Sequence, residues 1–178
     1  MIKWRPLNAC VAMLLVTLAA GCSSPASREA MVPSGGAISK HFQSSVRVQT
    51  GGGSETGALD SSNISDADFK LAIEDAIVQS RLFKTVVQGA DGDYELSVRI
   101  TSLTKPVFGA TFTVDLETAW SLTRSTDRSA VMRKSVKSTG TATMGEALVA
   151  VVRLRLAVEK AARENIGQGL QAIAELNL

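Results

Sequence analysis

The chain has 178 residues, of which 45% are hydrophobic and 20% charged, and its formal net charge is +2. This composition excludes an intrinsically disordered chain, which would be poor in apolar residues and strongly charged. The basic residues Lys3 and Arg5 precede the cleavage site described below, and without them 17 basic residues face 17 acidic ones. A neutral mature chain lacks the basic surface that nucleic-acid binding requires, so no nucleic acid is expected as a partner.

The N-terminus has the layout of a signal peptide. Lys3 and Arg5 supply a positive start, and residues 9–20 form an apolar stretch that only Thr17 interrupts. This stretch is shorter than the roughly 20 apolar residues of a membrane-spanning helix. We therefore predict a signal peptide over residues 1–21.

Small residues at positions 19–21 lead directly to Cys22. This arrangement resembles the lipobox of bacterial lipoproteins, in which the cysteine receives diacylglycerol and becomes the new N-terminus. The lipobox usually has leucine three residues before the cysteine, whereas this chain has Ala19. The alternative is an ordinary secretory signal cut after Gly21, with the cysteine there by coincidence. By resemblance to lipoprotein sorting, Ser23 rather than aspartate favours the outer membrane, with the protein facing the periplasm.

A segment rich in Ser, Gly, Ala and Pro follows, over residues 22–45. It shows no apolar period, so we predict a flexible tether that carries the lipidated Cys22 and holds a single domain, residues 46–178, off the membrane. The only histidine, His41, lies in this segment and is expected to be solvated. No cysteine follows Cys22, so the domain must be stabilised by its core and not by an internal disulfide.

The first half of the domain mixes strand and helix patterns. Residues 46–50 alternate as a strand does, and the glycine-rich segment 51–57 fits neither the dinucleotide fingerprint nor the P-loop, so we expect a turn. Ser65 with Asp68 three residues later predicts the start of an amphipathic helix that ends near Arg81. Residues 82–87 predict a short strand.

Three longer strands and a helix follow. Residues 94–101, 112–122 and 131–143 alternate between apolar and polar, as antiparallel strands with one buried face do. The third carries basic residues that suit an edge strand (Arg133, Lys134, Lys137). The period becomes helical from about residue 145, with Gly167 and Gly169 predicting a bend or break.

The order of these elements predicts an α+β domain. We expect a mainly antiparallel sheet of about four to five strands with two helices packed on one face.

The acidic residues offer two weak candidate sites. Asp91, Asp93 and Glu95 suggest calcium by their spacing, but a turn leading into a strand explains them better. Asp115 and Glu117 have the residue types of a glycosidase pair, but they also fit the solvated face of an amphipathic strand. Because no nucleophile has a partner base in the domain, we expect no enzyme activity, no catalytic residue, no metal and no cofactor.

Four residues are candidates for contact with a partner. Val107 and Phe108 fall in a loop between two strands, where they either contact a partner or lipid, or fold back over the core. Arg155 lies on the apolar stripe of the last helix, near Arg153, and either pairs with an acid or marks an interface.

Several segments carry a family resemblance: Gly52-Gly53-Ser54-Glu55-Thr56, Tyr94-Glu95-Leu96, Phe108 to Val114, Arg153 to Ala157, Glu159, and Glu164-Asn165-Ile166. Together they resemble a family of small uncharacterised lipoproteins of Gram-negative bacteria, over nearly the whole mature domain. Some members carry an automatic label as a UDP-N-acetylglucosamine acyltransferase. That label does not fit, because such enzymes have hexapeptide repeats and a catalytic histidine, and this chain has no such repeat and its one histidine in the tether.

Two functions follow from these expectations. The first is a non-enzymatic interaction module, anchored to the outer membrane and serving an envelope protein partner. A flat apolar patch or a symmetric self-contact between copies would favour this function. The second is a binder of a small ligand such as a lipid, a glycan or a peptidoglycan fragment. A concave apolar pocket would favour this function.

Overall fold

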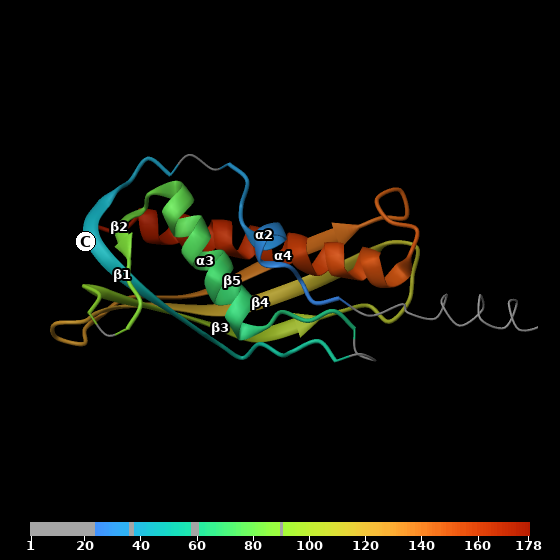
Figure 1. The fold of residues 1–178 in the computed structure, drawn as a ribbon, viewed down its shortest axis with the longest axis horizontal. Coiled ribbons are helices and arrows are strands. Elements are labelled where there is room, and N and C mark those ends of the chain that lie inside the picture. Colours follow the sequence, from blue (N-terminus) through green and yellow to red (C-terminus); the bar gives the residue numbers. More distant parts are fainter. Residues whose placement is uncertain (1–23, 36–37, 58–60, 90) are drawn as a thin grey trace, which may run out of the picture.

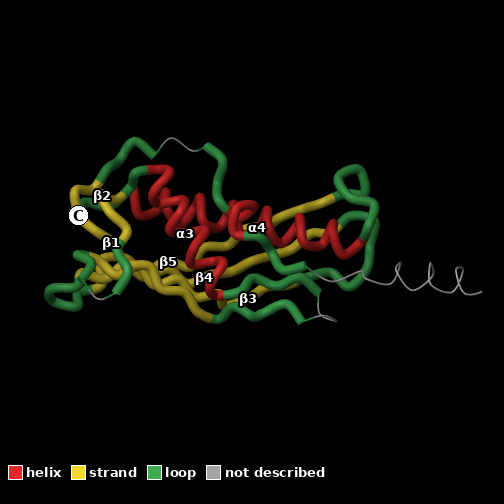
Figure 2. The backbone as a smooth tube through the Cα atoms, viewed as in Figure 1, coloured by secondary structure: helices red, strands yellow, loops and turns green. Residues whose placement is uncertain are grey.

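A single sheet forms one layer of the fold, and helices cover one of its faces (Figures 1 and 2). The structure is a computed structural model that describes residues 24–35, 38–57, 61–89 and 91–178. The expected signal peptide and Cys22 lie outside the described residues. The elements in chain order are α2 (Arg28–Met31), β1 (Phe42–Gly51), α3 (Asp66–Ser80), β2 (Phe83–Val86), β3 (Tyr94–Thr104), β4 (Phe112–Arg124), β5 (Ala130–Ala142) and α4 (Ala150–Ala174).

The sheet has five strands in the order β2-β1-β3-β4-β5, so β5 is an edge strand as its basic residues predicted. Strand β4 shows the expected alternation most clearly, because every second residue from Phe112 to Leu122 is buried. These buried side chains meet α4, while α3 packs against β1 and β2. The α+β class and the number of strands are therefore confirmed, and a short third helix, α2, joins the two that were predicted.

The prediction of a mainly antiparallel sheet is corrected, because the sheet is mixed. Strands β3, β4 and β5 pair antiparallel, but β1 runs parallel to both of its neighbours. Strand β2 pairs with the first half of β1 and ends with Val86 opposite Val46, and β3 begins with Tyr94 opposite the same residue on the other side. The connection 87–93 can therefore be short, because β3 begins at the level where β2 ends. Parallel strands ordinarily need a long crossover that brings the chain back to the starting edge of the sheet.

The predicted break at Gly167 and Gly169 is also wrong, since α4 is one continuous helix through both glycines. Gly169 is there for packing: a Cβ at this position would lie 2.3 Å from the indole of Trp120. The indole is fixed in turn, because its Nε1 donates to Thr118 Oγ1 at 2.8 Å and to Asn165 Oδ1 at 3.3 Å. The glycine thus lets the helix approach a large side chain of the sheet.

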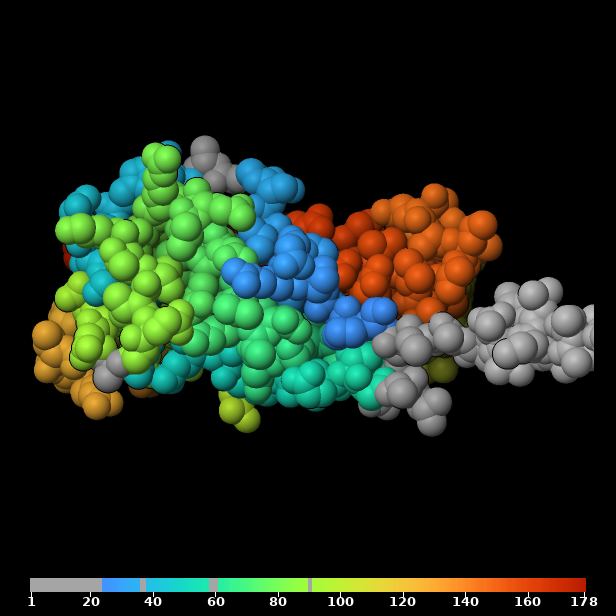
Figure 3. Space-filling model, viewed as in Figure 1, coloured from blue at the N-terminus to red at the C-terminus, as the bar shows by residue number. Residues whose placement is uncertain are grey.

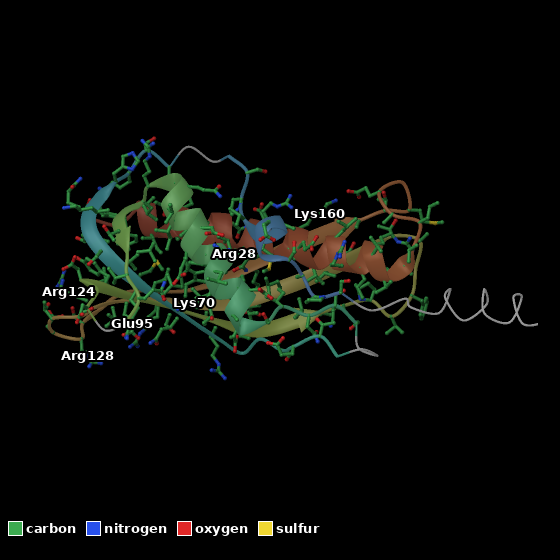
Figure 4. All side chains as sticks on the ribbon, in the orientation of Figure 1. Arg28, Lys70, Glu95, Arg124, Arg128 and Lys160 are labelled. Atoms are coloured by element: carbon green, nitrogen blue, oxygen red, sulfur yellow. The ribbon has the colours of Figure 1, made fainter. Side chains whose placement is uncertain are left out.

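The flexible tether is corrected for its described part, because residues 24–31 pack against the domain. Ala26 and Met31 are buried, and α2 contacts both α3 and α4. Arg28, labelled in Figure 4, pairs through its Nε with Asp75 Oδ2 of α3 at 2.5 Å, and the Ser27 N–H donates to the buried Glu159 of α4 at 3.0 Å. The packed domain therefore begins well before residue 46. Ala26 and Met31 are isolated apolar residues that form no period, so pattern alone did not reveal their burial.

Candidate functional site

The most distinctive surface of the described chain lies at one end of the molecule, where two loops meet. The loop 105–111 joins β3 to β4, the loop 143–149 joins β5 to α4, and both lie at the same end in Figure 1. Five large apolar side chains on these loops are exposed, and we call them the apolar tip: Val107 (93% exposed), Phe108 (87%), Met144 (48%), Leu148 (80%) and Val149 (58%). An exposed cluster of this kind marks a contact surface.

The structure excludes one of the two expectations for Val107 and Phe108, and their contact with a partner or lipid stays a prediction. Phe108 does not fold back over the core, because most of its surface faces solvent. Met144, Leu148 and Val149 were not foreseen as part of the site, since the sequence placed Leu148 on the buried stripe of a helix that begins five residues later than expected, at Ala150. The available signal was the low charge of the segment 141–152, in which Glu146 is the only charged residue.

Arg153, a predicted contact residue, is buried beneath the tip and fixes both loops. Its Nη1 donates to the carbonyl oxygens of Ala147 at 2.7 Å and Leu148 at 3.2 Å, and its Nη2 donates to that of Gly109 at 3.0 Å. The guanidinium also lies 4.7 Å from the ring centre of Phe112 at the start of β4. Arg153 is therefore a structural support of the site and not itself a contact surface.

Arg155, the other predicted contact residue, pairs with an acid, which was the alternative expectation. Its Nε lies 3.7 Å from Oε1 of Glu159, one turn further along α4. The same carboxylate accepts the Ser27 N–H, so the pair joins α4 to the docked N-terminal segment.

The negative charge of Glu146, in the loop between β5 and α4, is neutralised by Lys160 of α4. Glu146 Oε1 lies 2.5 Å from Nζ of Lys160 on α4 (Figure 4), and its Oε2 accepts the Thr143 N–H at 3.1 Å. The hydrogen bond from Lys160 and then that from the Thr143 backbone lower the pKa of Glu146. The carboxylate is therefore ionised but paired, which leaves no unpaired charge from it beside the apolar side chains.

The opposite end of the molecule is charged. There the hairpin between β4 and β5 carries Arg124, Asp127 and Arg128, and Figure 4 shows both arginines far from the apolar tip. Arg124 lies 3.6 Å from Asp127 and 6.0 Å from the ring centre of Tyr94. The molecule therefore has one apolar end and one charged end.

The described N-terminal segment begins beside the apolar tip. The Ser24 carbonyl accepts a hydrogen bond of 2.8 Å from Ser62, whose own carbonyl accepts one of 3.1 Å from Lys105. Lys105 is the first residue of the tip loop that carries Val107 and Phe108. In Figure 3 the blue atoms of this segment lie on the side of the domain nearer the orange β5–α4 loop than the charged hairpin.

The acidic candidates do not come together as a site. Asp93 bonds to Ser45, and Glu95 pairs with Arg47, so neither is free to join Asp91 around a calcium ion. In the described parts of the chain, no group of three or more His, Cys, Asp or Glu side chains is placed to hold a metal.

The remaining candidates also have structural partners. Asp115 and Glu117 lie on the open face of the sheet and accept hydrogen bonds from Thr139 and Ser135 of β5, as the solvated face of a strand would. His41 is exposed as expected, and its Nδ1 donates to the Arg81 carbonyl at 2.8 Å.

We predict a specific acid sensitivity at Asp93. Its carboxylate accepts the Ser45 N–H and then the Ser45 hydroxyl, both at 2.7 Å, and these bonds lower the pKa of Asp93 below its ordinary 3.8. A lowered folded-state pKa stabilises the fold above the unfolded value, and this contribution is lost as the pH falls through the folded value. Asp93→Asn is therefore expected to lower the unfolding free energy near neutral pH and to converge with the wild type as the pH falls below about 3.8.

Urea unfolding measured across this pH range tests the expectation. Asp91→Asn, an exposed position in the same connection, is the control for net charge. A stability difference for Asp93→Asn that stays constant down to the lowest pH would contradict the role of these hydrogen bonds.

Open grooves, not enclosed cavities, mark the seam between β5 and α4. One is lined by Lys134, Lys137, Glu164 and Gln168 among others, and the next by Lys160 and Arg163 as well. Their linings are largely polar and charged, so neither groove is the concave apolar pocket that a small-ligand binder was expected to show. No helix among the described residues is both long and apolar enough to cross a membrane.

Comparisons with known proteins identify the fold. No family model matches the sequence, and no curated protein matches it. A protein from Xanthomonas campestris, of the family DUF330, has a TM-score of 0.56 at 12% identity, over 80% of this chain and 91% of its own. A hypothetical protein from Chlamydia trachomatis has a TM-score of 0.51 at 8% identity, over 72% and 96%. An uncharacterised lipoprotein B from Nitrosomonas europaea has a TM-score of 0.50 at 12% identity, over 79% and 88%. At these identities the likeness shows a shared fold.

Proposed function

We propose that this chain is a lipoprotein of the bacterial envelope, anchored through Cys22 to the periplasmic face of the outer membrane. In this proposal it acts without catalysis, as an accessory module that binds another envelope protein. The likeness in fold to the Nitrosomonas europaea lipoprotein supports the location, and Ser23 after the cysteine supports the outer membrane.

One observation carries the proposal: the packed domain begins at Ser24, immediately after the proposed anchor. Only Ser23 lies between Cys22 and Ser24, and extended chain spans at most about 3.6 Å per residue. The lipid would therefore hold the domain against the bilayer and not at the end of a long leash. Two or more acyl chains would make this attachment stable, whereas one chain binds only reversibly.

The binding role, rather than a catalytic one, is supported by the structural contacts of the candidate arginines and carboxylates. The arginines and carboxylates singled out from the sequence mostly serve as loop supports, ion pairs or cross-strand hydrogen bonds in the described parts of the chain. The described helices cover one face of the sheet only, so the other face, which carries the exposed Arg99 and Thr113, is open to a protein partner.

The anchor is tested by metabolic labelling with radioactive palmitate. We expect the wild-type protein to be labelled and to fractionate with the outer membrane. The Cys22→Ser variant should carry no label and should leave the membrane fraction. Persisting label in that variant would refute lipidation at Cys22.

The accessory role is tested by photo-crosslinking in intact cells. A photoreactive residue is placed at exposed positions of the open sheet face, such as Arg99 and Thr113, and adducts are identified by mass spectrometry. We expect one reproducible adduct with an envelope protein that depends on Cys22. Absence of any such adduct from all positions tested would count against a protein partner.

A further inference from the structure

The apolar tip is not explained by the stability of the domain, because its side chains face solvent. We propose that it is a membrane contact: Val107, Phe108, Leu148 and Val149 enter the headgroup region of the bilayer beside the lipid anchor. This inference rests on the anchoring at Cys22 proposed above, and it names the partner of the tip as a lipid surface.

The chemistry of the two loops fits a lipid surface. Residues 106–114 include no charged residue, and residues 141–152 include only Glu146, which is held by Lys160. The apolar face of an interfacial helix is buried about 5–10 Å into the boundary between headgroups and acyl chains, and we expect a similar depth for the side chains of the tip. The charged hairpin at the opposite end would then face the aqueous space.

The two loops of the tip are also held in a fixed position relative to each other. Arg153 donates to carbonyl oxygens of both loops, so the two halves of the tip are tied to one buried side chain. This arrangement keeps Phe108 and Leu148 on one surface even though neither side chain packs into the core.

The described chain begins at the same end, two positions after Cys22. Ser24 is bonded to Ser62, and Ser62 to Lys105, which leads into the tip loop. The lipid on Cys22 would thus enter the bilayer close to where Val107 and Phe108 meet it. A protein partner on the tip would need no such proximity to the anchor, so the lipid surface is the occupant that the structure favours.

The test compares two single tryptophan substitutions in the full-length protein. Phe108→Trp places an indole on the tip, and Val78→Trp places one at a position that is 61% exposed near the C-terminal end of α3. Val78 lies beside Phe83 of β2, whose ring is 6.2 Å from that of Tyr94 at the start of β3, so it is far from the tip loop at the end of β3. Trp120 is buried and contributes the same background to both variants.

The proteins are purified from membranes and reconstituted into vesicles of phosphatidylethanolamine and phosphatidylglycerol, with and without a spin-labelled lipid quencher. We expect the quencher to reduce the emission from position 108 by roughly two-fold or more and that from position 78 little. Equal quenching at the two positions, or none at either, would overturn the membrane contact. A photoreactive residue at position 108 that forms a protein adduct and no lipid adduct in cells would overturn it as well.

Failure of the anchor is distinguished from failure of the tip. If the protein is not recovered with the vesicles, lipidation at Cys22 fails, and the chain from Cys22 onward is instead coupled through that thiol to a maleimide lipid. The same comparison of positions 108 and 78 then decides the tip inference.

Discussion

Replacing Gly169 by alanine is expected to destabilise the domain by about 1–3 kcal/mol, whereas the same change at Gly167 is expected to stabilise it by up to about 1 kcal/mol. Both glycines lie in α4, two residues apart. Alanine favours a helix over glycine at each position, so intrinsic propensity alone predicts a gain at both. The surroundings of the two positions reverse the sign at one of them.

At Gly169 the new methyl group has no room. Its Cβ would lie 2.3–2.5 Å from three atoms of the Trp120 ring, well inside van der Waals contact. The ring cannot swing away cheaply, because it is buried and its Nε1 is bonded to Thr118 and Asn165. At Gly167 the nearest atom is Pro33 Cγ at 3.9 Å, an ordinary contact distance.

Urea or thermal unfolding of the two variants measures the difference. A double-mutant cycle with Trp120→Leu supplies the control, because the smaller side chain removes the ring that the methyl group meets. We expect the cost of Gly169→Ala to fall in that background. If Gly169→Ala is as well tolerated as Gly167→Ala in the wild-type background, helix α4 does not approach the sheet as closely as the structure has it.

Local patterns in the sequence predicted the elements that have one buried face and one solvent-exposed face. Strand β4 alternates between the helix layer and solvent, and helix α3 begins at the Ser65 cap and ends at Arg81, so period and capping were enough. The edge position of β5 followed from its lysines, because charge on an edge strand resists pairing with another chain.

Long-range geometry accounts for what the sequence did not predict. The parallel pairing of β1 depends on β2 and β3 meeting at the level of Val46, which no local pattern encodes. Gly169 was taken as a helix breaker because the Trp120 ring beside it comes from another element. The tether looked flexible because Ala26 and Met31 are buried individually, and two isolated apolar residues make no period.

The candidate site was predicted in part for the same reason. Val107 and Phe108 stood out because they are apolar residues in a hairpin loop, and the structure leaves them exposed. Leu148 continued the period of the last helix, so the pattern assigned it to the core. The helix begins only at Ala150, which places Leu148 and Val149 in a loop.

Replacing Arg153 by methionine is expected to destabilise the domain by about 2–3 kcal/mol and to loosen both loops of the tip. The substitution removes three hydrogen bonds from a charged donor to carbonyl oxygens, together with the contact to the Phe112 ring. A hydrogen bond to a charged group contributes about 1.5–3 kcal/mol, and water on the exposed loops offsets part of the loss. Methionine keeps the apolar stem, so the effect reports mainly on the guanidinium.

Hydrogen exchange resolves where this loss falls. We expect faster exchange in residues 105–111 and 143–149 of Arg153→Met, with little change at the charged hairpin of Arg124 and Arg128. Arg133→Met, an exposed arginine on β5, is the matched control and should stay within about 0.5 kcal/mol of the wild type. If the membrane inference holds, Arg153→Met should also weaken the lipid quenching at position 108, because the loops would no longer be held together. Unchanged exchange in both loops would show that Arg153 does not hold the tip, and another contact would then have to fix the two loops.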